Sequence, residues 1–183
     1  MKPLEIKNFL TEEECDLIVK KSESFEFQQA TTSYSNIKNV VNEKLDFNKR
    51  KIYHTPPDVF PKLSEKILNK LEELNLFNGI TYTLIPGYSF NKYTKDDFLN
   101  YHVDGDEIDN GASITLVLEL SDNFEAGEFV YKINDIEYSF DKGKGSLYIF
   151  DSNTLHKVNK VTAGVRYSIN CWPKYIKTKK NIF

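Results

Sequence analysis

The chain has 183 residues, 40% of them hydrophobic, which is enough to bury one sizeable core, so we expect a single domain. Its net charge is -3, so no overall positive charge favours nucleic acid or an anionic membrane as a partner, and we expect neither. The first nine residues hold no long apolar stretch, which argues against a signal peptide or a membrane span and predicts a reduced, cytoplasmic setting with both cysteines buried.

The first predicted element is a helix that begins after Thr11 and runs to about Ser24. Thr11 can cap its N-terminus, and Glu14, three residues later, completes a capping box. Leu10 and Cys15 stand at the two positions of a hydrophobic staple. These signals predict a well-defined start for the helix.

Residues 25–57 are polar and rich in Asn, Lys and Ser, so we expect a strand or two with long loops. The part from Thr31 to Pro57 is long enough to form a lid over a binding mouth. The basic run Lys49, Arg50 and Lys51 favours a solvated loop, and the alternative is contact with an acidic group of a substrate. His54 is interpreted as a loop or lid residue.

A second helix is predicted over residues 59–75, with Asn78-Gly79 ending it. Its apolar residues recur at a spacing that places them on one helix face: Leu63, Ile67, Leu71 and Leu74.

From residue 80 onward the pattern predicts strands. The dipeptide Asn134-Asp135 is suited to a type I′ hairpin turn between two of them. The predicted strands cover residues 80–85, 88–93, 112–120, 129–133, 136–140, 146–150 and 165–172. Two helices followed by about eight strands at short spacing predict an α+β domain with a double-stranded β-helix, or jelly-roll, core. We expect a helical and loop part over residues 1–79, the jelly-roll core over 80–173 and a short, solvated basic tail over 174–183.

Two histidines and one aspartate form the most informative pattern in the chain. His102 and Asp104 are two residues apart, so on an extended segment both side chains point the same way. His156 follows 54 residues after His102, near the start of a late strand. Two imidazoles and one carboxylate are the ligand set of non-haem Fe(II) oxygenases, which leave coordination positions open.

Plainer interpretations of these residues stay open. A lone His-x-Asp arises often by chance, and either histidine alone is more often a core or surface residue. A calcium site over Asp104, Asp106 and Glu107 is disfavoured because Ile108 stands where a third oxygen ligand belongs. The pattern is also compatible with a cupin-like sugar-modifying enzyme, with a zinc hydrolase, and with a non-catalytic domain that senses a metabolite or oxygen.

From Tyr82 to Trp172 the chain resembles the Fe(II)/2-oxoglutarate-dependent dioxygenases, and among them the prolyl 4-hydroxylase-like branch. The resemblance implies that His102, Asp104 and His156 are the iron ligands. Arg166, ten residues after His156, matches the basic residue that binds the distal carboxylate of 2-oxoglutarate, for which a guanidinium is well suited.

Three further matches support the resemblance. Tyr93 stands where the family places a tyrosine that hydrogen-bonds the same carboxylate, and Trp172 matches an aromatic residue that lines the pocket. Residues 126–128 resemble the family's Gly-Gly-Glu turn. Taken singly, Tyr93 and Trp172 also suit plain packing, and Arg166 could pair with a surface acid such as Asp151 or Glu128.

The resemblance implies hydroxylation of an unactivated C–H bond, with release of succinate and CO2. The implied cofactors are Fe(II), 2-oxoglutarate and O2, with ascorbate as a possible addition. The implied substrate is a prolyl residue of a peptide or protein, or a free amino acid. Two departures weaken the transfer of substrate identity: the prolyl hydroxylase branch often has Lys in place of Arg166, and Phe129 stands where many members carry Thr. Asp104 is present, whereas family halogenases replace that carboxylate, so hydroxylation is the expected outcome.

Overall fold

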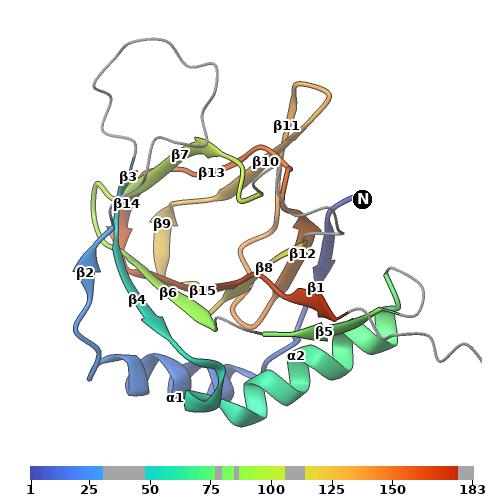
Figure 1. Cartoon of the computed structure of the whole chain (residues 1–183). Helices are drawn as coiled ribbons and strands as arrows, with labels where there is room; N and C mark the ends of the chain where they lie inside the picture. The colour runs from blue at the N-terminus through green and yellow to red at the C-terminus, as the bar shows by residue number, and fades with distance from the viewer. Residues whose placement is uncertain (31–47, 77–79, 85–86, 106–113, 177–183) are drawn as a thin grey trace, which may run out of the picture.

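A computed structural model describes residues 1–30, 48–76, 80–84, 87–105 and 114–176 of the chain (Figure 1). Within them two antiparallel sheets face each other around a central space, and the helices lie outside one sheet (Figure 1). The predicted α+β double-stranded β-helix is confirmed.

The larger sheet has seven strands and the smaller has five. In spatial order the larger contains β1 (Leu4–Ile6), β12 (Leu147–Asp151), β8 (Ile114–Glu119), β15 (Arg166–Cys171), β6 (Tyr88–Tyr93), β4 (Lys51–Thr55) and β2 (Gln28–Gln29). The smaller contains β11 (Ile136–Ser139), β10 (Phe129–Ile133), β13 (His156–Val158), β7 (Phe98–His102) and β3 (Asn48–Lys49). Two further pairs join β14 (Val161–Gly164) to β9 (Phe124–Ala126) and β16 (Lys174–Ile176) to β5 (Thr81–Thr83).

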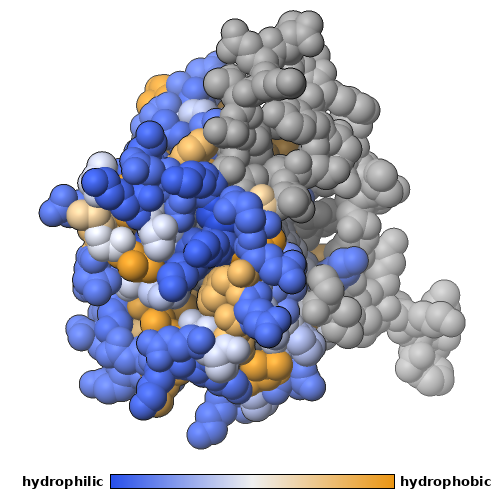
Figure 2. All heavy atoms as spheres, turned by 90° about the vertical axis from the view of Figure 1, so that its left-hand side faces the viewer, coloured by the Kyte–Doolittle hydropathy of each residue, from blue (hydrophilic) through white to orange (hydrophobic). Residues whose placement is uncertain are grey.

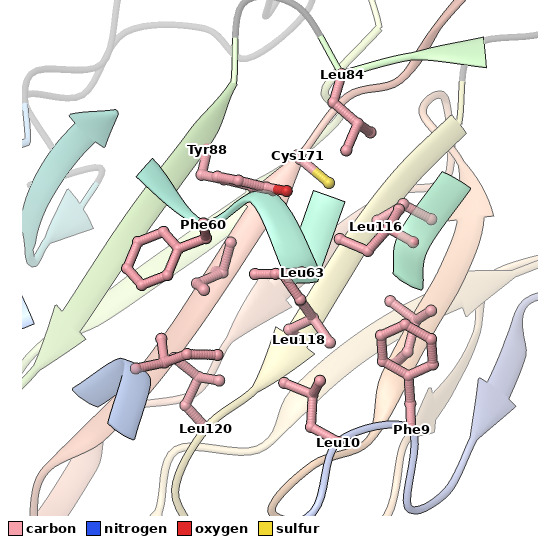
Figure 3. Close-up of a cluster of buried hydrophobic side chains, with 14 of the residues drawn as sticks. Phe9, Leu10, Phe60, Leu63, Leu84, Tyr88, Leu116, Leu118, Leu120 and Cys171 are labelled. Carbon is pink, nitrogen blue, oxygen red and sulfur yellow. The ribbon is translucent and has the colours of Figure 1, made fainter. Parts of the chain in front are cut away.

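The helices α1 (Glu12–Ser22) and α2 (Pro61–Leu74), with a 3-10 turn at Pro57–Val59, cover the outer face of the larger sheet (Figure 1). Figure 3 shows Leu63 of α2 packed with Leu116 and Leu118 of β8 in the hydrophobic core between them. Neither helix is long and apolar enough to cross a membrane, nor is any other helix in the described residues.

Side chains of β8 alternate between this helix-side core and the space between the two sheets. Leu116 and Leu118 pack toward the helices, whereas Val117 packs in a second cluster that also holds Phe129 and Phe150. Because successive strand residues point to opposite faces, Thr115 and Glu119 share the inward face with Val117. The site described below is built on this inward face.

Local predictions for the two helices were partly right. The capping box is confirmed, since Thr11 Oγ1 accepts from the Glu14 backbone and Glu14 accepts from the Thr11 backbone. The first helix ends at Ser22, two residues before the expected end. The second covers Pro61–Leu74, close to the predicted 59–75, and ends where Asn75 adopts the left-handed conformation with φ 43°. The predicted stop signal, Asn78-Gly79, lies outside the described residues.

Among the strand predictions, one turn is confirmed and two regions differ from expectation. Asn134 and Asp135 have φ values of 50° and 64°, so the type I′ turn is confirmed. Four strands from before residue 80 join the sheets. Three of them (β2, β3 and β4) lie within residues 25–57, where a strand or two was expected, and β1 was not predicted. The first residues of the basic tail form β16, which pairs with β5.

The side of the molecule that carries β2 and β4 is largely hydrophilic, with hydrophobic residues exposed in small patches (Figure 2).

Candidate metal centre and adjoining cavity

Two histidines on neighbouring strands form the centre of the site. His102 ends β7 and His156 begins β13, and the antiparallel register makes them direct cross-strand partners. Their ring centroids lie 4.1 Å apart. Residues that are 54 positions apart in the sequence are thus brought together by one strand pairing.

Asp104 reaches both histidines from just beyond the end of β7. His102 Nε2 lies 3.3 Å from Asp104 Oδ1, and His156 Nε2 lies 3.5 Å from Asp104 Oδ2. One possible ligand atom from each of the three side chains lies within 4.8 Å of the others. The structure therefore places the three predicted residues in one cluster.

Backbone carbonyls set the orientation of both imidazole rings. His102 Nδ1 lies 3.0 Å from the carbonyl oxygen of Asn100, and His156 Nδ1 lies 2.8 Å from that of Thr154. A carbonyl oxygen only accepts, so in these bonds each Nδ1 donates and each Nε2 keeps its lone pair. This is the tautomer that metal-binding histidines adopt.

The Asp104 carboxylate is anchored by the larger sheet. Thr115 Oγ1 of β8 donates to Asp104 Oδ2 at 2.9 Å and lies 3.1 Å from Ser152 Oγ. The backbone N–H of Asp104 donates to the carbonyl of Ser152 at 2.8 Å. Since His102 and His156 belong to the smaller sheet, the cluster joins the two sheets of the jelly roll.

The protonation states of the cluster suit a cation. Burial alone would raise the pKa of Asp104, but its electrostatic interactions with His156 and His102 outweigh burial, and the pKa lies well below the usual range. Burial lowers the pKa of His156 to about 4, against the opposing attraction of Asp104. At neutral pH Asp104 is therefore ionised and His156 neutral, which are the forms that bind metal.

Aromatic side chains fix His156 from two sides. The ring of Phe129 stacks on it at a centroid distance of 5.3 Å, and Phe150 meets it edge-on at 5.0 Å. His156 is 1% exposed, so its ring has little freedom to turn away from Asp104.

The donor set and its spacing fit a divalent metal ion. Ligands about 2.1 Å from one ion and near right angles to each other lie about 3 Å apart. The separations of 3.3 Å and 3.5 Å around Asp104 are close to that value. Two imidazoles and one carboxylate leave coordination positions open, as in non-haem Fe(II) sites and unlike closed structural zinc sites.

Arg166 and Tyr93 lie together on the inward face of the larger sheet. They are cross-strand partners on β15 and β6, and the guanidinium carbon of Arg166 lies 5.2 Å from the centroid of the Tyr93 ring. Arg166 is 1% exposed and Tyr93 is 2% exposed. The structure thus brings together the two residues to which the family resemblance assigns one carboxylate.

Glu119 is a residue of the site that the sequence interpretation missed. Arg166 does not pair with Asp151 or Glu128; it donates to Glu119 Oε2 from Nε at 3.0 Å and from Nη2 at 2.7 Å. The Glu119 side chain is 3% exposed. The available signal was a carboxylate within the otherwise apolar run of residues 116–120.

Several buried polar atoms on the inward strand faces meet no hydrogen-bond partner among the described residues. A buried polar atom without a partner costs about 1–3 kcal/mol, so a group of them in one place indicates space for a polar ligand. These atoms are Asn91 Oδ1, Glu119 Oε1, Arg166 Nη1 and Asn170 Oδ1. A ligand with carboxylate and keto oxygens, such as 2-oxoglutarate, suits the Arg166 end of this group of atoms.

Trp172 stands directly after β15, at the edge of the site. Its indole N–H meets no acceptor at hydrogen-bonding geometry among the described residues, yet it lies near enough to Asp104 to help lower the pKa of that carboxyl. With His54, Thr55 and Gly87 it lines a hollow of about 340 Å³. His54 belongs to β4, so its interpretation as a loop residue was wrong.

The basic run also lies in strands and not in a solvated loop, because Lys49 ends β3 and Lys51 begins β4. Lys49 pairs with Asp97 at 3.8 Å, and Lys51 is exposed. Arg50, between them, has Nε and Nη1 buried without a hydrogen-bond partner in the described part of the chain. Most of the predicted lid, together with Asp106 and Glu107, lies outside the described residues.

Comparison with known proteins gives the class to which this site belongs. Residues 88–174 match the model of the 2OG-Fe(II) oxygenase superfamily, a segment that contains Tyr93 and the whole His102, Asp104, His156 and Arg166 set. Over this segment, a little under half of the chain, the protein is similar to the 2OG-Fe(II) oxygenase superfamily.

Among similar proteins, a PKHD-type hydroxylase of Idiomarina loihiensis is 32% identical over 123 residues, covering 64% of this chain and 56% of that protein. A PKHD-type hydroxylase of Prochlorococcus marinus is 32% identical over 122 residues, covering 64% and 55%. The chain spans a little over half the length of these curated relatives.

Solved structures share the fold at low sequence identity. A Pseudomonas putida prolyl-4-hydroxylase superposes with a TM-score of 0.68 at 16% identity, covering 94% of this chain and 91% of that one. A Trichoplax adhaerens prolyl hydroxylase, solved with a hypoxia-inducible-factor peptide fragment, superposes with a TM-score of 0.72 at 19% identity, covering 93% and 82%.

Proposed function

We propose that this protein is an Fe(II)- and 2-oxoglutarate-dependent dioxygenase that hydroxylates an unactivated C–H bond and releases succinate and CO2. The observation that carries the proposal is the cross-strand pair His102 and His156 with Asp104 between their Nε2 atoms. The match of residues 88–174 to the model of the 2OG-Fe(II) oxygenase superfamily supports the same conclusion.

In this proposal His102, Asp104 and His156 hold the iron. Bound iron with 2-oxoglutarate supplies the oxidising power, at the expense of the oxidative decarboxylation of that co-substrate. The chain itself orients the ligands: the carbonyls of Asn100 and Thr154 fix the histidine rings. Ascorbate as an additional reductant remains part of the proposal.

Arg166 and Tyr93 are proposed to bind the distal carboxylate of 2-oxoglutarate, with Trp172 lining the pocket. Glu119 occupies the Nε side of the Arg166 guanidinium, and Nη1 remains without a partner among the described residues. The Nη1 and Nη2 edge of a guanidinium can receive a carboxylate through two parallel hydrogen bonds. The Tyr93 ring lies against the guanidinium and so restricts its orientation.

The proposed substrate is a prolyl residue of a peptide or protein, or a free amino acid. The fold shared with prolyl hydroxylases favours the first choice by analogy alone. Arg50 favours an acidic group on the substrate, because its buried Nε and Nη1 lack a hydrogen-bond partner in the described residues. Arg50 also lies near the metal centre, since its positive charge helps to lower the pKa of His156. A substrate carboxylate beside the metal centre would satisfy these nitrogens.

An anaerobic titration of the Fe(II)-loaded protein with 2-oxoglutarate tests the proposal. A saturable visible charge-transfer band is expected, and it should be absent from His156→Ala. His54→Ala is the matched control, since His54 is the one histidine of the chain outside the cluster. Oxygen-dependent succinate release then separates an enzyme from a sensor or a cupin-like domain. A folded, iron-bound protein that gives no band would refute the 2-oxoglutarate proposal.

A further inference from the structure

Glu119 holds one edge of the Arg166 guanidinium, and the carboxylate of the proposed co-substrate would approach the other edge. Its Oε2 already accepts two hydrogen bonds from Arg166, at 3.0 Å and 2.7 Å, while its Oε1 is buried without a partner among the described residues. The pair is nearly solvent-free, with the side chains 1% and 3% exposed. As a Glu–Arg pair it is neutral, so it offers an incoming dianion little net attraction.

We infer that Glu119 is a positioning residue for the co-substrate, and that it takes up one proton when a dicarboxylate such as 2-oxoglutarate binds to Arg166. The inference rests on the proposed function, since it assumes that Arg166 is the carboxylate-binding residue. The proton comes from solvent and ends on the Glu119 carboxylate. The protonated Glu119 still accepts from Arg166 through its carbonyl oxygen and gains one donor.

The reason is electrostatic. Two carboxylates at one guanidinium in a water-poor cavity repel each other, and such pairs are relieved when one of them binds a proton. Burial already raises the pKa of Glu119 above its ordinary value, although the charge of Arg166 opposes this. A second negative charge at Arg166 raises it further, so binding and protonation are coupled.

Glu119 is the group at this position that can change charge near neutral pH. Around it lie Arg166 on β15, Tyr148 on β12 and Cys15 on α1, with Lys142 and Asp122 acting from nearby loops. Burial raises the pKa of Tyr148 far above neutral, and it raises the pKa of Cys15 to about 12. Burial opposes the charge of Arg166, but the neighbouring Glu119 raises its pKa, so the guanidinium stays positive. Lys142 and Asp122 are exposed.

The test is the affinity of the iron-loaded protein for 2-oxoglutarate as a function of pH, measured anaerobically by the charge-transfer band. Linkage predicts a wild-type Kd that rises by up to about tenfold per pH unit above about pH 7. Glu119→Gln keeps an acceptor for Arg166 but has no charge, so its Kd should be flat with pH and lower than the wild-type Kd at about pH 8. Glu125→Gln, an exposed carboxylate on β9, is the control and should keep the wild-type slope.

Calorimetry of the wild-type protein gives a second readout that needs no variant. Binding heats measured in buffers of different ionisation enthalpy should report net proton uptake on addition of 2-oxoglutarate. A merely structural Glu119–Arg166 pair predicts no uptake, a flat wild-type Kd and weaker binding in Glu119→Gln, and this result overturns the inference. Absence of the band at every pH would instead contradict the proposed function itself.

Discussion

Thr115 and Glu119 lie on the same inward face of β8 and touch opposite ends of the site. Thr115 donates to Asp104 at the metal centre, and Glu119 accepts from Arg166. They are four positions apart on the strand, which corresponds to about 13 Å between their Cα atoms. One strand therefore sets the distance between the proposed metal ligands and the proposed co-substrate carboxylate site, and its helix-side leucines anchor it in the hydrophobic core.

Removal of the Thr115 hydroxyl should weaken metal binding. Thr115→Val keeps the shape of the side chain but leaves Asp104 Oδ2 without its donor at 2.9 Å. Groups that orient metal ligands typically contribute about 10–100-fold in affinity, so a loss of that size is expected. The measurement is a titration of metal-free protein with Fe(II) under anaerobic conditions. Thr115→Ser should retain most of the affinity, and equal affinities for wild type and Thr115→Val would contradict this role.

The cluster of His102, Asp104 and His156 was predictable from the sequence because its chemistry is carried by rare residue types. The chain has three histidines, and two of them fall in the pattern with Asp104. The register that pairs His102 with His156 was not predictable, since spacing along the chain does not determine which strands become neighbours. The residue types of this cluster could therefore be read from the sequence, whereas their proximity follows only from the pairing of β7 with β13.

Glu119 was missed because both faces of β8 are buried. In a strand with one solvated face, alternation marks which residues point inward, but here the run of residues 114–119 is buried throughout. In the sequence, a glutamate at the end of such a run suggests that the strand ends there and that the side chain turns toward solvent. A strand or two was expected within residues 25–57, but the positions of β2 and β3 could not be predicted, since each is two residues long and polar.

Truncation of Phe129 should destabilise the domain. Phe129 is 5% exposed and packs against Phe150, Tyr148 and the ring of His156. Phe129→Ala should lower the free energy of unfolding by about 3–5 kcal/mol, because the cavity left behind cannot fully collapse. Denaturant unfolding of the metal-free protein measures it. Ile136→Ala, at a residue 57% exposed, is the control and should change the value by about 0.5 kcal/mol or less.

The stability of the metal-free protein should fall as the pH is lowered through the range set by His156. Burial lowers the pKa of His156 from 6.5 to about 4, so between these values the unfolded chain binds a proton that the folded chain does not. The free energy of unfolding therefore rises with pH across this window, by at most about 3 kcal/mol. This contribution of His156 is lost as the pH falls through the same window.

Urea unfolding at a series of pH values measures this dependence against two variants. His156→Gln should remove the His156 contribution to the slope, whereas His54→Gln, at an exposed position of β4, should retain it. A wild-type slope that persists unchanged in His156→Gln would show that another group is responsible.

Replacement of Arg50 should separate substrate binding from co-substrate binding. Arg50→Gln removes a guanidinium whose buried Nε and Nη1 have no partner in the described residues, and Lys51→Gln at the exposed neighbouring position is the control. A hydrogen bond to a charged group contributes about 1.5–3 kcal/mol, so kcat/KM for a carboxylate-bearing substrate should fall about 10–100-fold. The affinity for 2-oxoglutarate should not change, because the proposal assigns the carboxylate of 2-oxoglutarate to Arg166. Succinate release with free amino acids and their matched amides measures the effect. Equal rates for acids and amides in the wild type, or a loss of 2-oxoglutarate affinity in Arg50→Gln, would assign Arg50 a different role.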